Sequence, residues 1–477
     1  MQKKESKVHY LFSNMALFTV SNFVSKLLVF LLVPFYTNVL TEAEYGVADV
    51  MQVSLLLLVP LLSVNAGEAA LRYGIENPDK RVSILRSGLR RVFFSAGIVL
   101  VACAAALFLP LSQELKIYIS LFAVLFAFNA IYEFMLLYTQ GCEQVKIMIT
   151  GSVSCTAFII GCNLFFLLVL RLGLYGYIYS QMAAYALSSL IMFGLIVRQW
   201  RQKNPSSCHA EEDLALRSEM LDYGKGMLLY STSSWINNAI DRYFILFMMG
   251  AASNGIYGVA YKIPAILMVF QRIFAQSFQM SATKSYREYD AARFFSRLYG
   301  LYNAVMVSGC SVILLILHPL AHFMFNKGFI AARIYVPPLL ISIIFGALNG
   351  FLGSICLAYK DGKSMGQATG IGAVLNIGLN FIGIKLFGIM GAAVATMLSY
   401  FTMFAVAFFK TGKHVKLKVN FLKDLGAYLL LLAEAVIAIR EVPMYYLYNA
   451  AITALLLVTY GREIMTVAKD YLKKIKK

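Results

Sequence analysis

Residues 41–48 read TEAEYGVA, and 212 positions later residues 253–260 read SNGIYGVA. A second pair, LGLYG at 172–176 and LFGIMG at 386–391, ends in glycines 215 positions apart. Each stretch stands beside a long apolar run. Two matches at nearly the same shift predict an internal repeat of six membrane-spanning helices. Because six is an even number, both copies enter the membrane with the same orientation.

The composition places the chain in a lipid bilayer. Of the 477 residues, 60% are hydrophobic and 14% are charged, whereas a soluble domain has about 25% charged residues. The formal net charge of +18 indicates membrane orientation, since Lys and Arg concentrate in cytoplasmic loops, and it does not indicate a nucleic-acid partner. None of the seven cysteines forms a CxxC pair, so we expect small buried hydrophobes and neither a metal site nor a cofactor.

The apolar runs predict an all-α protein with about fourteen membrane-spanning helices. With the N-terminus inside, 32 of the 42 Lys and Arg residues fall in inside segments, six in outside segments and four within spans. This split predicts that both termini are cytoplasmic. The repeat then divides the chain into lobes at 1–205 and 206–412, followed by two helices and a basic tail at 413–477. The predicted spans are 12–36, 46–67, 91–111, 117–139, 148–169, 174–197, 221–249, 254–282, 297–317, 335–357, 364–386, 389–410, 422–439 and 443–461.

Four cations remain inside predicted spans, and we expect them to line a positively charged cavity because charge at the bilayer centre costs roughly 3 kcal/mol. They are Lys26, Arg242, Lys262 and Arg272, and Arg72 follows the second span. Under the repeat, Lys26 corresponds to Asn238, one helical turn before Arg242. A cavity of this charge suits a phosphate or diphosphate. Arg272 also fits a side chain that reaches toward the cytoplasmic edge.

Acidic residues near these cations are candidates for coupling or gating. They are Asp49, Glu68, Glu133 and Asp241. Glu68 and Arg72 stand four residues apart, as a helical ion pair requires. Asp241 and Arg242 are neighbours that do not share a helix face, so we expect each to pair elsewhere. Glu434 is a further carboxyl inside a predicted span.

Four stretches resemble the polysaccharide-transporter branch of the multidrug/oligosaccharidyl-lipid/polysaccharide exporter superfamily. They are PFYTNVLTEAEYG at 34–46, ALRYG at 70–74, WINNAIDR at 235–242 leading to GIYGVAYKIP at 255–264, and GIMGAAVAT at 388–396. The resemblance covers nearly the whole chain, including the 6+6+2 layout. The seventh span departs from the family pattern, because GKG at 224–226 replaces a proline.

The resemblance implies a two-lobed, MATE-like bundle around a cationic cavity in the bacterial cytoplasmic membrane. It implies alternating access that moves an undecaprenyl-diphosphate-linked oligosaccharide to the outer leaflet, for O-antigen, lipopolysaccharide or capsule synthesis. Polysaccharide polymerase and glycosyltransferases are the implied partners. Arg72, Asp241, Arg242 and Lys262 fall within family-like motifs. Lys26 lies outside these motifs, and it is a candidate only because of its depth in the predicted first span.

Three other readings stay open. A multidrug or cation antiporter of the same fold would be expected to have more acidic and fewer basic residues in its cavity. A lipid II flippase would have the same layout. A membrane polysaccharide polymerase would be an enzyme, but it needs a substantial outer loop, and the outer connections predicted here are short. The driving force also stays open among a proton gradient, a sodium gradient and the membrane potential.

Overall fold

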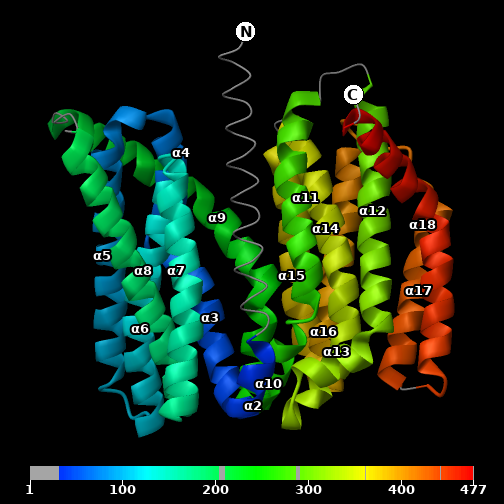
Figure 1. Cartoon of the computed structure of the whole chain (residues 1–477), viewed down its shortest axis with the longest axis horizontal. Coiled ribbons are helices and arrows are strands. Elements are labelled where there is room, and N and C mark those ends of the chain that lie inside the picture. Colours follow the sequence, from blue (N-terminus) through cyan, green and yellow to red (C-terminus); the bar gives the residue numbers. More distant parts are fainter. Residues whose placement is uncertain (1–31, 204–209, 286–289, 360, 441, 476–477) are drawn as a thin grey trace. The chain divides into compact units, whose positions relative to one another are not determined.

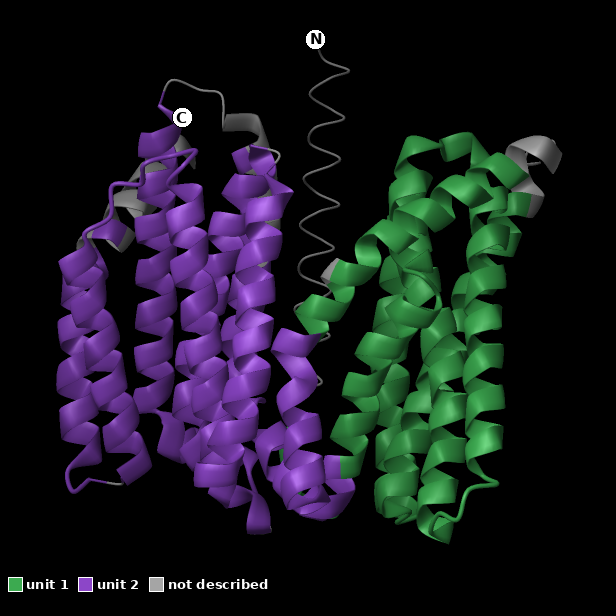
Figure 2. Ribbon diagram, turned by 180° about the vertical axis from the view of Figure 1, so that it is seen from behind, with its two compact units in different colours: residues 1–40, 47–235 green, residues 41–46, 236–477 purple. Residues whose placement is uncertain are grey.

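The computed structural model describes residues 32–203, 210–285, 290–359, 361–440 and 442–475. These residues form helices joined by short connections, and the described ranges contain no strand (Figure 1). The all-α prediction is confirmed for them. The predicted first span, including Lys26, lies almost entirely outside the described residues. The chain divides into two compact units, one of residues 1–40 and 47–235 and the other of residues 41–46 and 236–477 (Figure 2).

Unit 1 is a bundle in which α5 packs on α6, α4 packs on α5 and α6, and α8 packs on α6 and α7. Its helices are α2 (Val33–Val39), most of α3 (Glu42–Leu62), α4 (Ala66–Glu76), the 3-10 turn η1 (Pro78–Lys80), α5 (Arg81–Ala106), α6 (Gln113–Gly141), α7 (Val145–Asn163), the π-helical turn η2 (Leu164–Val169), α8 (Gly173–Lys203) and the first part of α9 (Ala210–Met249).

Unit 2 has α14 at its centre, in contact with α11, α12, α15, α16 and α17. Nineteen of the 23 residues of α14 are buried, which explains its nearly continuous apolar sequence. The other elements are the rest of α9, α10 (Ala251–Ala260), α11 (Pro264–Ser285), α12 (Ala291–Leu315), α13 (Leu317–Met324), η3 (Lys327–Tyr335), α14 itself (Val336–Ala358), α15 (Gly362–Phe387), α16 (Ile389–Thr411), α17 (Phe421–Arg440) and α18 (Tyr445–Ile475).

Nine helices in the described ranges are long and apolar enough to cross a membrane. They coincide with nine of the predicted spans. Five contain α3, α5, α6, α7 and α8, and four contain α12, α14, α15 and α16. Large apolar side chains point outward on several of them, including Phe94, Val101 and Val374, which are 69%, 71% and 74% exposed. A soluble protein does not expose so much apolar surface. The chain is therefore a multi-pass membrane protein.

Two predicted spans are interrupted in the structure. The predicted span 254–282 is divided into α10 and α11, because Pro264 cannot continue a helix and begins a new one. The predicted span 46–67 ends at Leu62, where Val64 and Asn65 have positive φ angles of 53° and 49°. Asn65 is a residue that tolerates this conformation, and α4 starts immediately after it.

The break between α3 and α4 also explains the glycine at the start of the predicted seventh span. A Cβ atom on Gly224 would lie 2.1 Å from the carbonyl oxygen of Val64. The Asn65 side chain donates to the Gly224 carbonyl at 3.3 Å and accepts from the Ser231 hydroxyl at 3.0 Å. Gly224 therefore allows α9 to pack directly against the interrupted backbone.

The first turn of α3 crosses α10 with backbone nearly touching backbone. A Cβ atom on Gly46 would lie 1.9 Å from the Ala251 carbonyl oxygen, and one on Gly255 would lie 1.9 Å from the Glu42 carbonyl oxygen. The Asn254 side chain donates to the Gly46 carbonyl at 2.9 Å. This crossing places residues 41–46 in unit 2, although the rest of α3 belongs to unit 1.

Replacing Gly255 with alanine is expected to destabilise the protein by about 1–3 kcal/mol, since the new methyl group forces the crossing backbones apart. Gly366→Ala in α15 is the matched control, because no atom lies within 4 Å of its Cβ position and alanine favours a helix over glycine. Thermal unfolding of the two purified variants measures the difference. Equal melting temperatures would contradict the close crossing.

Candidate polar centre on α9

The α9 segment of unit 2 carries a buried ion pair. Asp241 and Arg242 on α9 are 1% and 7% exposed, and the Arg242 Nη1 atom lies 3.2 Å from Asp241 Oδ1. The prediction that each pairs elsewhere is wrong. The arginine side chain is long enough to fold back along the helix, where Nη1 also donates to the Asn238 carbonyl at 3.1 Å.

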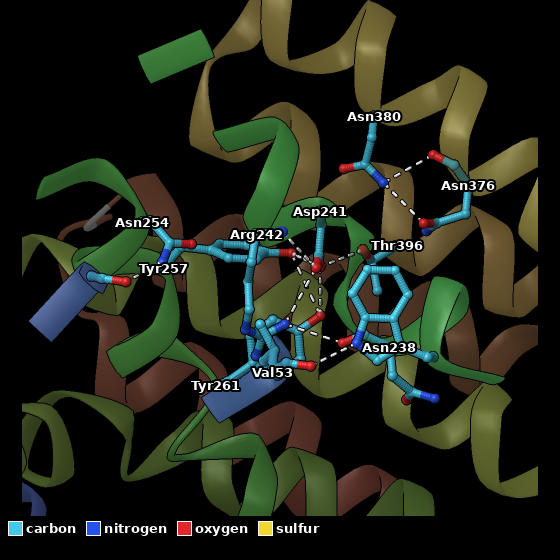
Figure 3. Close-up of polar contacts among 12 residues, drawn as sticks. Val53, Asn238, Asp241, Arg242, Asn254, Tyr257, Tyr261, Asn376, Asn380 and Thr396 are labelled. Atoms are coloured by element: carbon cyan, nitrogen blue, oxygen red, sulfur yellow. Dashed lines mark hydrogen bonds and ion pairs between the residues drawn. The ribbon is translucent and has the colours of Figure 1, made fainter. Parts of the chain in front are cut away.

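Asp241 receives hydrogen bonds from three helical segments (Figure 3). Its Oδ2 atom accepts from the hydroxyls of Tyr257 at 2.6 Å, Tyr261 at 3.0 Å and Thr396 at 3.3 Å. Its Oδ1 atom accepts from the Arg242 backbone N–H at 2.9 Å. The two oxygen atoms of this carboxylate thus have the hydrogen-bond partners that a buried polar group requires.

The turn at Gly250 brings the two tyrosines to this carboxylate. Gly250 has a φ of +91°, which a residue with a side chain rarely adopts, and it joins α9 to α10. Tyr257 and Tyr261 stand four residues apart, so their rings lie on one face. The Arg242 guanidinium lies 4.2 Å from the centre of the Tyr261 ring, a cation–π contact that partly replaces its hydration.

Further amide and hydroxyl groups lie around the ion pair (Figure 3). The Tyr400 hydroxyl on α16 donates to Asn238 Oδ1 at 2.7 Å. On α15, Asn380 donates to the carbonyl and the side-chain oxygen of Asn376 at 2.9 and 3.1 Å. Asn376 Nδ2 and Asn380 Oδ1 have no hydrogen-bond partner among the described residues. Buried amides with open positions are unusual and often mark a binding site.

The other predicted cations do not join this ion pair in the described residues. Lys262 directly follows Tyr261, in the turn before α11, and its Nζ atom lies 5.9 Å from the centre of the Tyr45 ring. Arg272 is exposed on α11.

Arg72 is exposed on α4, and the predicted Glu68–Arg72 pair is wrong because Arg72 Nε lies 3.1 Å from Glu76 Oε1. Tyr223, 4.7 Å beneath the same guanidinium, holds Arg72 in this orientation.

The predicted acidic residues other than Asp241 lie in unit 1. Asp49 on α3 and Glu68 on α4 are half-buried, and Glu133 on α6 is exposed. The described residues contain no cluster of three or more His, Cys, Asp or Glu side chains that could hold a metal ion. Oxygen atoms of Asp241 and Thr396 are nevertheless hard ligands of the kind that alkali cations accept.

The sequence reading missed the partners of the ion pair. Tyr257, Tyr261 and Thr396 all lie in stretches that resemble the family, and Tyr257 also lies in the repeated YGVA stretch. No pattern in the sequence indicated that these hydroxyls contact Asp241. A buried tyrosine one helical turn from another would have been a usable signal, because buried hydroxyls need partners.

Comparison with known proteins assigns the family. Residues 11–283, more than half of the chain, match the family described as polysaccharide biosynthesis protein. The chain belongs to this family. The match includes Asp241, Arg242, Tyr257 and Tyr261.

Two archaeal proteins are similar to this polysaccharide biosynthesis protein. The probable low-salt glycan biosynthesis flippase Agl15 of Haloferax volcanii is 25% identical over 227 residues, 46% of this chain and 48% of the relative. The chain thus spans about half the length of that flippase. An uncharacterised membrane protein of Methanocaldococcus jannaschii is 24% identical over 290 residues, 58% of this chain and 68% of the relative.

Solved structures share the fold at low sequence identity. The lipid II flippase MurJ, in an inward closed conformation, superposes with a TM-score of 0.67 at 16% identity and covers 96% of this chain and 100% of its own. An inward-facing multidrug resistance MATE family transporter superposes with a TM-score of 0.68 at 12% identity, covering 81% and 94%. The fold is therefore MurJ- and MATE-like, which confirms the predicted MATE-like architecture, and these two neighbours are a flippase and a transporter.

Asp241→Asn is expected to destabilise the protein by about 3–5 kcal/mol, because it leaves the buried Arg242 charge without its counter-charge. The matched control is Asp222→Asn on the same helix, where the ion pair with Lys225 is 68% and 58% exposed and contributes less than about 1 kcal/mol. Unfolding of the purified variants in detergent gives both values. The double variant D241N/R242Q should be more stable than D241N alone. A D241N protein as stable as D222N would show that the pair does not hold the bundle.

Proposed function

We propose that the chain is a flippase that carries a polyprenyl-diphosphate-linked oligosaccharide across the membrane by alternating access. The observation that supports this most is the buried Arg242 guanidinium, held inside the helix bundle beside the Asp241 carboxylate. A guanidinium binds phosphate oxygens through two parallel hydrogen bonds. Membership of the polysaccharide biosynthesis protein family and the likeness to a glycan flippase support the same substrate class.

In this mechanism, Asp241 and the diphosphate compete for Arg242. While Asp241 is ionised, it neutralises the guanidinium at 3.2 Å. A proton or a sodium ion bound at Asp241 would cancel the negative charge that lies 3.2 Å from the Arg242 guanidinium, and the guanidinium would then attract an anionic headgroup more strongly in a medium of low dielectric constant. Uptake of the coupling ion would thus favour substrate binding. Lys26, Lys262, Arg272 and Arg72 are proposed to extend the positive path, and Asp49, Glu68 and Glu133 to gate or couple it.

The cellular context belongs to the same proposal. The distribution of lysine and arginine predicts fourteen spans with both termini in the cytoplasm. This topology would place the basic tail against anionic lipid. In a bacterium the carrier lipid would be undecaprenyl diphosphate, and the product would enter O-antigen, lipopolysaccharide or capsule synthesis with a polymerase and glycosyltransferases as partners. The repeat lobes 1–205 and 206–412 and the terminal pair 413–477 stay predictions.

Two alternatives share the fold. A multidrug antiporter is supported by the MATE likeness, with a TM-score of 0.68, and a lipid II flippase by the MurJ likeness, with a TM-score of 0.67. Drug susceptibility that rises on deletion while surface glycan is unchanged would favour the antiporter. Loss of viability on deletion would favour the lipid II flippase.

In a deletion strain complemented with Arg242→Ala, surface glycan is expected to fall at least tenfold while lipid-linked intermediates accumulate, because the diphosphate loses its bidentate partner. Arg242→Lys should retain partial activity, since lysine keeps the positive charge but lacks the two parallel N–H donors of the guanidinium. Arg293→Ala is the control, because Arg293 is 84% exposed. Immunoblots of the membrane fraction check that the variants accumulate equally. Wild-type glycan with R242A, at equal protein levels, would refute the proposal.

A further inference from the structure

A second buried carboxyl lies in unit 2, away from α9. Glu434 on α17 is fully buried. Its Oε1 atom accepts from the Ser311 hydroxyl on α12 at 2.7 Å and from the Thr453 hydroxyl on α18 at 3.0 Å. The two hydroxyls are themselves 2.9 Å apart. One carboxyl and two hydroxyls therefore connect three helices at a single point.

No cation lies within salt-bridge distance of Glu434 among the described residues, and its Oε2 atom has no hydrogen-bond partner there. Asn449, one helical turn from Thr453 on α18, is also fully buried, and both of its side-chain polar atoms lack a described partner. An ionised carboxylate buried without a counter-charge costs several kcal/mol, so such a group takes up a proton instead.

The neighbouring titratable groups do not change this conclusion. Cys310 on α12 and Tyr445 on α18 lie near Glu434, and neither side chain carries a positive charge in any protonation state. Arg333 of η3 acts on Tyr445, whose ring stacks on His318 at 4.1 Å. The central helix α14, which also packs on α17, has no Asp, Glu, Lys, Arg or His.

A line of polar side chains follows the same three-helix seam toward the start of α17. Asn303 on α12 donates to the Tyr460 hydroxyl at 3.3 Å and accepts from the Tyr428 hydroxyl at 2.9 Å. Tyr460 donates to Asp424 at 2.8 Å. Next to it, Lys423 pairs with Glu463 and stacks on the Tyr460 ring. Polar side chains thus continue from the Glu434 site along these helices to charged groups at the start of α17.

We propose that Glu434 is a proton-binding site in the membrane interior, separate from the Asp241 centre and reached from the Lys423–Asp424 end of α17. The proton resides on Oε2, while Oε1 accepts from Ser311 and Thr453. Loss of the proton leaves an anion among α12, α17 and α18, so it requires these helices to separate and admit water. Proton release at Glu434 is thereby linked to movement of the α17–α18 hairpin.

Infrared spectroscopy of the full-length protein in lipid nanodiscs, with ¹³C-labelled glutamate, tests the site directly. At neutral pH the wild type is expected to show a C=O stretch from a protonated glutamic acid, and Glu434→Gln should lose that band. Glu114→Gln is the control, because its exposed carboxylate accepts from Tyr118 at 2.6 Å and contributes to the carboxylate band only. Since these readouts involve no transport, the proposal stands or falls apart from the flippase assignment.

Two further measurements keep the test decisive. If E434Q does not fold, Thr453→Val is used instead, and its loss of one donor should shift the C=O band to higher frequency without removing it. A wild-type glutamate signal that is wholly carboxylate at neutral pH would overturn the proposal. Replacement of potassium by sodium at constant pH should leave the band unchanged, and conversion to carboxylate by sodium would assign the site to a metal cation instead.

Discussion

A charge inside a membrane bundle must be compensated by the protein itself, because hydrocarbon offers no hydrogen bonds. The buried carboxylate of Asp241 shows how unit 2 meets this requirement. Its partners come from α9 itself, from α10 and the turn after it, and from α16. The position of these elements is therefore tied to one ionised group, and any event that neutralises Asp241 acts on all of them together.

Close helix approach is the second requirement, and glycine supplies it. Gly224 lets α9 contact the backbone at the α3–α4 break, and Gly46 and Gly255 let α3 and α10 contact each other. None of these positions has room for a Cβ atom. On α15 and α16, Gly383 and Gly391 meet in the same way. Small residues let membrane helices approach until their backbones interact. The first YGVA stretch, on which the predicted repeat depends, thus contains the packing glycine Gly46, which gives its sequence a physical reason.

Local chemistry explains which features could be predicted from the sequence. Hydrophobic runs locate the nine spanning helices of the described ranges because the bilayer thickness sets their length. Breaks such as Val64–Asn65 were missed since they depend on backbone angles that an apolar sequence does not reveal. The ion pairs were mispredicted because they too depend on the folded structure. Arg72 selects Glu76 over Glu68 because Tyr223, distant in the sequence, orients its guanidinium, and Arg242 reaches its own neighbour once both are buried.

The account depends most on the claim that this polysaccharide biosynthesis protein moves a lipid-linked anionic glycan. Purified protein in proteoliposomes containing a polyprenyl-diphosphate oligosaccharide, with a lectin or glycosidase added outside, measures the movement of the glycan between leaflets. The account predicts transfer well above that of protein-free vesicles, and inhibition by excess polyprenyl diphosphate that bears no sugar. Transfer no faster than in empty vesicles, from a protein that exchanges an organic cation for protons in the same membranes, would contradict it.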